Sequence, residues 1–184
     1  MKSKSSTTVT KRQAKQNPDD IATLVLRDHK PIKELLLILK DPDVSLSKKH
    51  TAFMEFEPML SSHARAEEET LYDQLKDKDK TRIEALEGDS EHEIADRLMN
   101  EIKQITGDDD LWMAKVKVLA EVVDHHVKEE EKEVLKESIK SLSTAERAEV
   151  GAEYSRLLTK YRDDGKKSKD KGKRKTEEQR AEYI

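Results

Sequence analysis

The motif His-x-x-x-Glu-Glu occurs twice in this chain, and the two copies constrain its fold more than any other feature. They comprise His63, Glu67 and Glu68, and His126, Glu130 and Glu131. Residues four apart lie one above the other on the same face of an α-helix. Each copy therefore places an imidazole and a carboxylate side by side, and two such helices facing each other predict a metal centre.

Both motifs interrupt stripes of apolar residues at helical spacing. One stripe consists of Phe56, Leu60, His63, Glu67 and Leu71, and the other of Val116, Leu119, Val123, His126, Glu130 and Val134. A carboxylate buried on such a line is unfavourable unless it is paired or takes up a proton. A bound cation removes this penalty and keeps the carboxylate ionised. The positions of Glu67 and Glu130 therefore favour a metal more strongly than the spacing alone does.

Two further helical segments each direct one histidine toward the core. His29 shares a stripe with Val25 and Ile32, and His92 shares one with Met99. A single histidine on an apolar stripe is more often an ordinary core residue than a ligand. Four such histidines, one on each helix, together with two core carboxylates, reverse that preference and indicate a metal site.

The chain is predicted to be all-α. Charged residues make up 41% of its 184 residues, it has only five glycines and four prolines, and its apolar residues recur at helical spacing. We expect helices over about 18–40, 48–76, 80–105, 111–140 and 144–162. Short loops make neighbouring helices antiparallel, so the predicted architecture is an up-down-up-down four-helix bundle with an additional C-terminal helix.

The predicted bundle occupies residues 17–162 and lies between two basic segments. Residues 1–16 are polar and aperiodic, and residues 163–184 are highly charged, so both are predicted to be disordered tails. Asn17 and Pro18 form a helix start signal, and Ser143 with Glu146 fits a capping box. The acidic body argues against a nucleic-acid-binding domain, although the basic tails could contact a polyanion weakly.

The apolar stripe distinguishes ligand candidates from their neighbours. It selects His126 rather than His125, because adjacent helical positions diverge by about 100°. His125 is then left at the side of the bundle. Glu68 and Glu131 are interpreted as exposed, solubilising charges, with a supporting or ligand role beside the metal as the alternative. Tyr72 is interpreted as a core packing residue, with a place in the lining of the site as the alternative.

Only nitrogen and oxygen ligands are available to a metal in this chain. It contains no cysteine, which excludes thiolate sites, iron–sulfur clusters and disulfides. Histidine and carboxylate ligands suit iron, zinc and manganese alike. The residues themselves therefore leave the identity of the metal open.

Four groups of residues, in this order, resemble the hemerythrin-like, or HHE cation-binding, family. They are Asp28-His29, His63 to Tyr72, Glu91-His92-Glu93 and His126 to Glu131, and the resemblance extends over about residues 18–140. It implies an antiparallel four-helix bundle around two non-haem iron ions, with histidines as terminal ligands and carboxylates as bridges. The residues that it assigns as ligands are His29, His63, Glu67, His92, His126 and Glu130.

The chain departs from the oxygen-carrying members of that family at two positions. Those members have a second histidine one turn after the ligand on the third helix, and an aspartate as the bridge on the fourth. Here Asp96 and Glu130 occupy these positions. Fewer histidine ligands imply more open coordination positions, which favours reactivity over simple oxygen carriage. The absence of Glu-x-x-His pairs argues against a ferritin-like site.

The leading hypothesis is a di-iron protein that binds or responds to oxygen, nitric oxide or peroxide. Alternatives are an iron-storage or iron-sensing module, a peroxide-decomposing enzyme, and a structural bundle whose tails recruit partners. No catalytic acid or base can be named. Since no apolar run approaches about 18 residues, we expect a cytoplasmic protein with no membrane partner. The oligomeric state stays open.

Overall fold

The computed structural model describes residues 19–181, and every regular element within them is helical. The all-α prediction is therefore confirmed for this part of the chain. Helix α1 (Ile21–Lys40) begins slightly later than expected, because the side chain of Asp20 caps it by accepting a hydrogen bond from the amide of Ala22 at 3.0 Å. The predicted cap Asn17 and the predicted tail 1–16 lie outside the described residues.

Each of the two motif helices is interrupted by a π-helical segment that begins at the Glu of its His-x-x-x-Glu or at the next residue. The order is α2 (Leu46–Glu67), η1 (Glu68–Tyr72) and α3 (Asp73–Lys76) in one case, and α5 (Asp109–Glu129), η2 (Glu130–Val134) and α6 (Leu135–Ser141) in the other. Helical periodicity had predicted unbroken helices over 48–76 and 111–140. Segments of π-helix occur frequently at functional sites, where the extra residue in the turn changes which side chains face inward.

The helix between the two motifs is α4 (Arg82–Gln104), close to its expected range. A short turn then leads to α5. Gly107 has a φ of 73°, which glycine adopts without steric cost, and Asp108 caps α5 by accepting a hydrogen bond from the amide of Leu111. Gly107 and Asp108 therefore let the chain turn between α4 and α5 and start the second helix.

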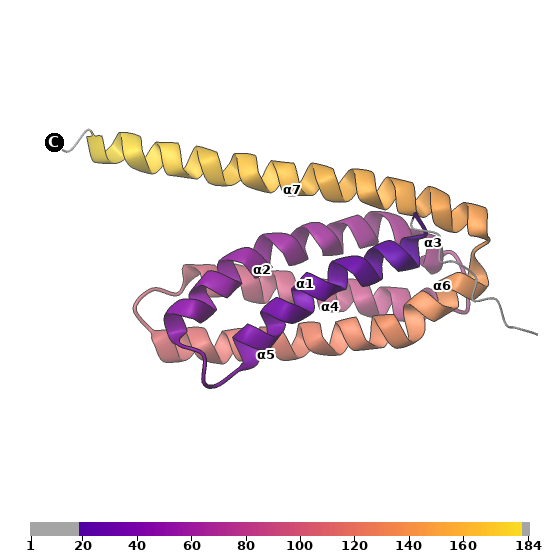
Figure 1. The fold of residues 1–184 in the computed structure, drawn as a ribbon, viewed down its shortest axis with the longest axis horizontal. Helices are drawn as coiled ribbons and strands as arrows, with labels where there is room; N and C mark the ends of the chain where they lie inside the picture. Colours follow the sequence, from indigo (N-terminus) through magenta and orange to yellow (C-terminus); the bar gives the residue numbers. More distant parts are fainter. Residues whose placement is uncertain (1–18, 182–184) are drawn as a thin grey trace, which may run out of the picture.

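Figure 1 shows α1, α2, α4 and α5 lying alongside one another, with the chain reversing direction at each short connection. Helix α1 contacts α2 and α5, and α4 contacts α5 and α2. The last helix, α7 (Thr144–Ala181), passes over α1 and α2 and contacts both. Five helices can therefore contribute side chains to the interior.

Helix α7 begins where it was predicted but continues past the expected end at 162. Its start is a capping box: the Ser143 hydroxyl accepts from the amide of Glu146, whose carboxylate accepts from the amide of Ser143. Its end at Ala181 contradicts the predicted boundary. Residues 163–181 contain no proline and are rich in lysine and arginine, which have favourable helix propensities.

Helix α7 packs closely against the beginning of α1. A Cβ atom added at Gly151 would lie 2.1 Å from the carbonyl oxygen of Asp19, so only glycine allows this approach. Nearby, Arg147 Nε lies 2.7 Å from Asp20 Oδ2. These contacts fix the position of α7 relative to the bundle.

A layer of polar side chains divides the core into two apolar clusters. One cluster includes Ile32, Phe56 and Val123, and the other includes Val25 and Leu71. The dividing layer lies where the four stripes carry histidine or glutamate, and these polar residues are as buried as the apolar ones around them. The interior of the bundle therefore contains a polar site enclosed at both ends.

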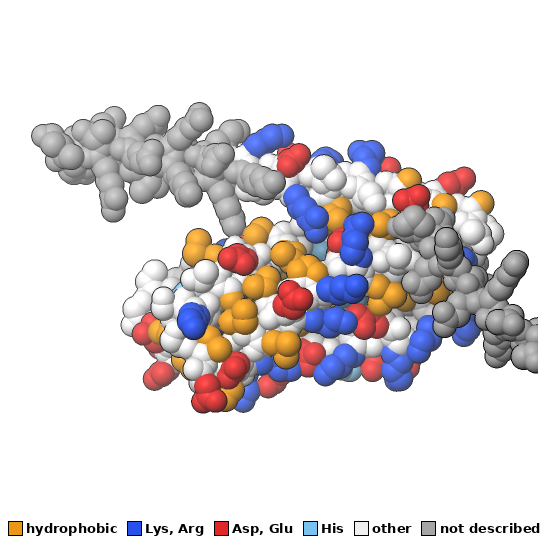
Figure 2. Space-filling view, in the orientation of Figure 1, with side chains coloured by type: hydrophobic (Ala, Val, Ile, Leu, Met, Phe, Trp, Pro, Cys, Tyr) orange, Lys and Arg blue, Asp and Glu red, His pale blue; other side chains and the backbone are white. Residues whose placement is uncertain are grey.

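The outer surface carries charges of both signs. On the face drawn in Figure 2, acidic and basic side chains are interspersed, with apolar side chains scattered over the bundle. Among residues 19–181, no helix is long and apolar enough to cross a membrane.

Candidate metal centre

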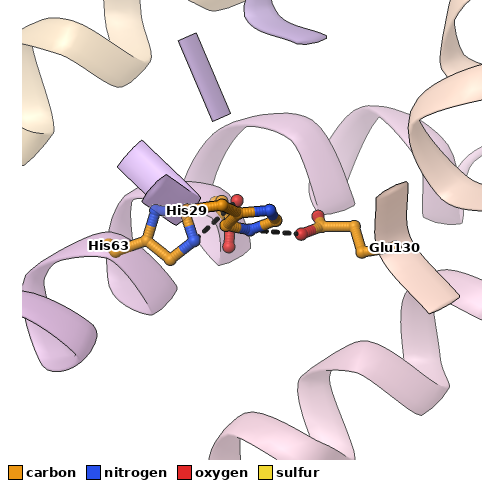
Figure 3. A group of neighbouring side chains, drawn as sticks. His29, His63 and Glu130 are labelled. Atoms are coloured by element: carbon orange, nitrogen blue, oxygen red, sulfur yellow. Dashed lines mark ion pairs between the residues drawn. The ribbon is translucent and has the colours of Figure 1, made fainter. Parts of the chain in front are cut away.

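Each of the four central helices directs one histidine into the polar layer. His29 comes from α1, His63 from α2, His92 from α4 and His126 from α5, and all four are buried. Figure 3 shows His29 lying between His63 and Glu130, with ion pairs connecting the group. All six predicted ligands, these histidines with Glu67 and Glu130, are thus brought together.

The six side chains form two groups that share a carboxylate. One group consists of His29, His63, Glu67 and Glu130, and the other of Glu67, His92 and His126; within each, one ligand atom per residue lies within 4.8 Å of the others. Each group is compact enough to surround one cation. Because Glu67 belongs to both, it is placed to join two ions.

Both carboxylates extend between two pairs of histidines, His29 with His63 and His92 with His126. Glu67 Oε1 lies 3.2 Å from His63 Nε2, and Glu67 Oε2 lies 3.7 Å from His92 Nε2. Glu130 Oε2 lies 3.1 Å from His29 Nε2 and 3.9 Å from His126 Nε2. Each glutamate therefore faces one histidine of each pair, as a bridging ligand would.

An outer ring of acceptors holds the histidines through their other nitrogen. The Nδ1 contacts are Glu131 for His29 at 3.0 Å, Tyr154 for His63 at 2.8 Å, Glu68 for His92 at 3.1 Å, and Glu91 for His126 at 2.8 Å. An imidazole that donates its Nδ1 proton keeps the Nε2 lone pair free to bind a metal. The ring therefore presents all four Nε2 atoms toward the same space.

Three residues were interpreted wrongly from sequence. Glu68 and Glu131 were expected to be exposed solubilising charges, but they accept hydrogen bonds from His92 and His29 and are only half-exposed. Tyr72 was expected to be packing alone, but its hydroxyl donates to Glu130 Oε1 at 3.1 Å. The second glutamate in both copies of the motif was the signal that could have indicated this role.

Tyr154 was missed by the sequence analysis because it lies outside the four predicted central helices. It is fully buried on α7, and its hydroxyl accepts from His63 Nδ1 and donates to Asp28 Oδ2 at 3.0 Å. The signal was an apolar stripe on α7 that Tyr154 shares with Leu158 and Tyr161. Helix α7, expected to pack outside the bundle, thus contributes to the site.

The remaining candidates stay away from the centre. His125 is exposed whereas its neighbour His126 is buried, which confirms the choice that the apolar stripe made between them. Asp96, at the position of the additional histidine of the oxygen carriers, is also exposed. His50 is exposed and stacks on Trp112.

The two buried carboxylates at the centre, Glu67 and Glu130, have pKa values shifted in opposite directions. Burial raises the pKa of Glu67 well above its usual value, and the neighbouring charge of Glu130 raises it further. Burial would raise the pKa of Glu130 as well, but contact with His29 and the other imidazoles lowers it to about 2. Burial thus works against charge on Glu67, whereas the imidazoles stabilise the charge of Glu130. A bound cation would keep both ionised.

Several buried polar atoms at the centre have no hydrogen-bond partner among the described residues. They are Nε2 of His29 and of His63, both carboxylate oxygens of Glu67, and Oε2 of Glu130. The contact between His29 and Glu130 is close, but it does not have the geometry of a hydrogen bond. Each such atom costs roughly 1–3 kcal/mol if it stays unsatisfied. A set of inward-facing nitrogen and oxygen atoms fits bound cations.

A family model describes this arrangement. Residues 20–137, more than half of the chain, match the hemerythrin HHE cation-binding domain. The chain belongs to the hemerythrin HHE cation-binding family. This membership confirms the resemblance seen in the sequence, and it indicates metal-ion binding by a domain whose core holds a His/Glu cluster. Comparison with curated proteins and with solved structures gave no significant match.

The contribution of α7 to the HHE domain gives a first prediction. Replacing Tyr154 by phenylalanine removes the hydroxyl that holds His63 and Asp28 while keeping the ring, and we expect metal affinity to fall about 10–100-fold. A competition titration against a chromophoric chelator measures this. The control is Tyr161→Phe on the same helix, because the Tyr161 hydroxyl binds Glu69 rather than a histidine. Equal affinities of the two variants would contradict the role of Tyr154.

Proposed function

We propose that this chain is a non-haem di-iron protein whose centre binds or responds to oxygen, nitric oxide or peroxide. His29 and His63 hold one iron, His92 and His126 hold the other, and Glu67 and Glu130 bridge them. The scaffold is the up-down-up-down four-helix bundle with an additional C-terminal helix. The observation that carries the proposal is that Glu67 directs its two oxygens at histidines of different pairs.

The donor count supports a reactive centre rather than a closed structural one. Four imidazoles and two bridging carboxylates supply four donor atoms to each of two ions, and iron in such surroundings accepts more. When bound, a pair of iron ions supplies one-electron chemistry and open positions for a small ligand. Zinc and manganese also accept these donors, so iron rests on the hemerythrin-like character of the domain.

The chain's own residues define how such a centre is held. The acceptors on Nδ1 fix the tautomer and orientation of each imidazole. Tyr72 donates to one oxygen of Glu130, which leaves the other oxygen directed at His29 and His126. Phe56, Val123 and the rest of the two apolar clusters keep water away from both ends.

Metal analysis combined with absorption spectroscopy tests this proposal. Protein made in iron-replete cells should contain about two irons per chain and show charge-transfer absorption of a bridged ferric pair. That absorption should change when nitric oxide or peroxide is added. Iron well below two per chain, with no such absorption, would overturn the proposal.

A second candidate function, iron sensing or storage, is favoured by the contact between α7 and His63. Tyr154 connects the centre to a helix that extends well beyond it, so occupancy of the centre can alter how firmly α7 is held. Hydrogen exchange of α7 should then slow when metal binds. If chelation leaves exchange of α7 unchanged, the sensing role fails, although ligand binding at the di-iron centre would still stand.

Turnover of peroxide distinguishes an enzyme from a binder. An enzyme would show steady-state turnover of peroxide that is lost in His63→Ala, whereas a protein that only binds peroxide shows no turnover even when unaltered.

A cytoplasmic location stays a prediction from the sequence.

A further inference from the structure

A small pocket opens onto the metal centre between α4 and the segment formed by α5 and η2. Its volume is about 190 Å³. It is lined by Tyr72, Glu84, Glu87, Gly88, Glu91, His125, His126, Glu129, Glu130, Glu133 and Val134, and we refer to it as the acidic pocket. It leads from exposed glutamates at the surface to buried residues of the centre.

The lining of the acidic pocket carries charge of one sign. It contains six glutamates and two histidines but no lysine or arginine. Lys132 lies beside it and approaches Glu133 at 2.9 Å and Glu129 at 3.7 Å, which offsets part of the negative charge at the rim. The net field still attracts cations and repels anions.

The lining of the acidic pocket includes Glu130, a buried carboxylate with one oxygen that has no hydrogen-bond partner among the described residues. Glu130 is 1% exposed, and its Oε2 has no hydrogen-bond partner. The hydroxyl of Tyr72 donates to the other oxygen of Glu130. The Tyr72 ring fits there because Gly88 has no Cβ atom; an added Cβ would lie only 2.7 Å from the ring. A cation that enters the pocket therefore meets Glu130 and His126, two of the predicted ligands.

Glu91 connects the surface of the acidic pocket with its floor. One of its oxygens lies 3.7 Å from Nε2 of the exposed His125, and the other lies 2.8 Å from Nδ1 of the buried His126. Among the side chains that the structure describes, the groups compact enough to hold a cation are the two at the centre. The outer residues of the pocket can therefore pass a cation inward without retaining it.

A larger groove between α2 and α4, which His92 helps to line, is less suited to this task. It measures about 700 Å³, and its lining includes Arg65 and Lys76 as well as acidic residues. Lys76 Nζ lies 2.5 Å from Asp89 Oδ2, so part of the acidic charge of the groove is already neutralised. The mixed lining offers a weaker attraction to cations.

We propose that the acidic pocket is the path by which divalent metal ions reach the centre. This inference rests on the proposed metal-binding function. A field of one sign in a narrow opening raises the association rate of an oppositely charged ligand by 10-fold or more. The carboxylates at the rim therefore determine how fast the centre is loaded, whereas the buried ligands determine how tightly the ion is held.

Stopped-flow mixing of metal-free protein with Co²⁺ tests the path, with the absorption of bound Co²⁺ as the readout. The variant Glu87→Gln/Glu129→Gln/Glu133→Gln removes three charges from the acidic pocket. Its matched control, Asp73→Asn/Glu93→Gln/Asp96→Asn, removes three from the groove. We expect the first to slow association about tenfold at low salt, with unchanged final stoichiometry, and the control to slow it less than twofold.

The salt dependence provides a second measure, since screening should slow the unaltered protein toward the rate of the pocket variant. Equal slowing in both triple variants, or in neither, would overturn the proposed path while leaving the metal centre intact. Failure of the unaltered protein to bind Co²⁺ would instead overturn the proposed function and this inference together. Circular dichroism of each variant verifies that its helices are intact.

Discussion

Replacing Glu67 by glutamine is expected to lower the metal content from about two ions per chain to fewer than one. Glutamine keeps the shape of the side chain but has one oxygen and no charge, so it cannot serve two ions at once. The two oxygens of Glu67 face His63 and His92, which belong to different pairs. Losing this one side chain should therefore weaken both sites, and metal analysis after gel filtration measures the loss.

Two comparisons make the Glu67 result specific. His63→Ala removes a ligand from one group only, so it should retain about one ion per chain. Glu69→Gln changes an exposed glutamate two residues away from Glu67 and should retain both. If Glu67→Gln keeps two ions, Glu67 does not bridge, and the two groups must be filled independently.

Metal binding is expected to raise the melting temperature of the metal-free protein by about 8–16 °C at free metal about 1,000 times the dissociation constant. At that ratio, binding to the folded state alone adds about 4 kcal/mol to the free energy of unfolding. For chains of this size, 1 kcal/mol corresponds to roughly 2–4 °C. Thermal unfolding followed by circular dichroism, before and after metal is added, measures the shift.

The same experiment on Glu67→Gln separates binding at the centre from weak binding elsewhere. This variant should show only a small rise in melting temperature, because its centre is not filled. A rise as large as that of the unaltered protein would assign the stabilisation to surface carboxylates. No rise in either protein would support a purely structural bundle.

The inward direction of the four histidines and two central glutamates could be predicted from sequence because burial follows helical periodicity. Glu67 and Glu130 interrupt apolar stripes, and a one-residue error would have moved them to the surface. The choice of His126 over His125 depended on the same reasoning. The caps at Asp108 and Ser143 were also predictable, because their hydrogen bonds are formed within three residues.

The outer ring could not be predicted in the same way because it depends on the local helix type and on tertiary packing. An unbroken α-helix would direct Glu68 and Glu131 about 100° away from Glu67 and Glu130, and the π-helical segments change the turns that follow. Tyr154 lies 91 residues from its partner His63. Neither contact leaves a periodic signal in the sequence near the motif.

The position of Tyr154 also bears on where this protein could be divided. The family match ends at residue 137, before α7 begins, yet the hydroxyl that orients His63 comes from α7. A recombinant fragment cut at the family boundary would contain all six predicted metal ligands but would leave His63 Nδ1 without its acceptor. The smallest fragment in which all four imidazoles are anchored must therefore include α7 at least as far as Tyr154.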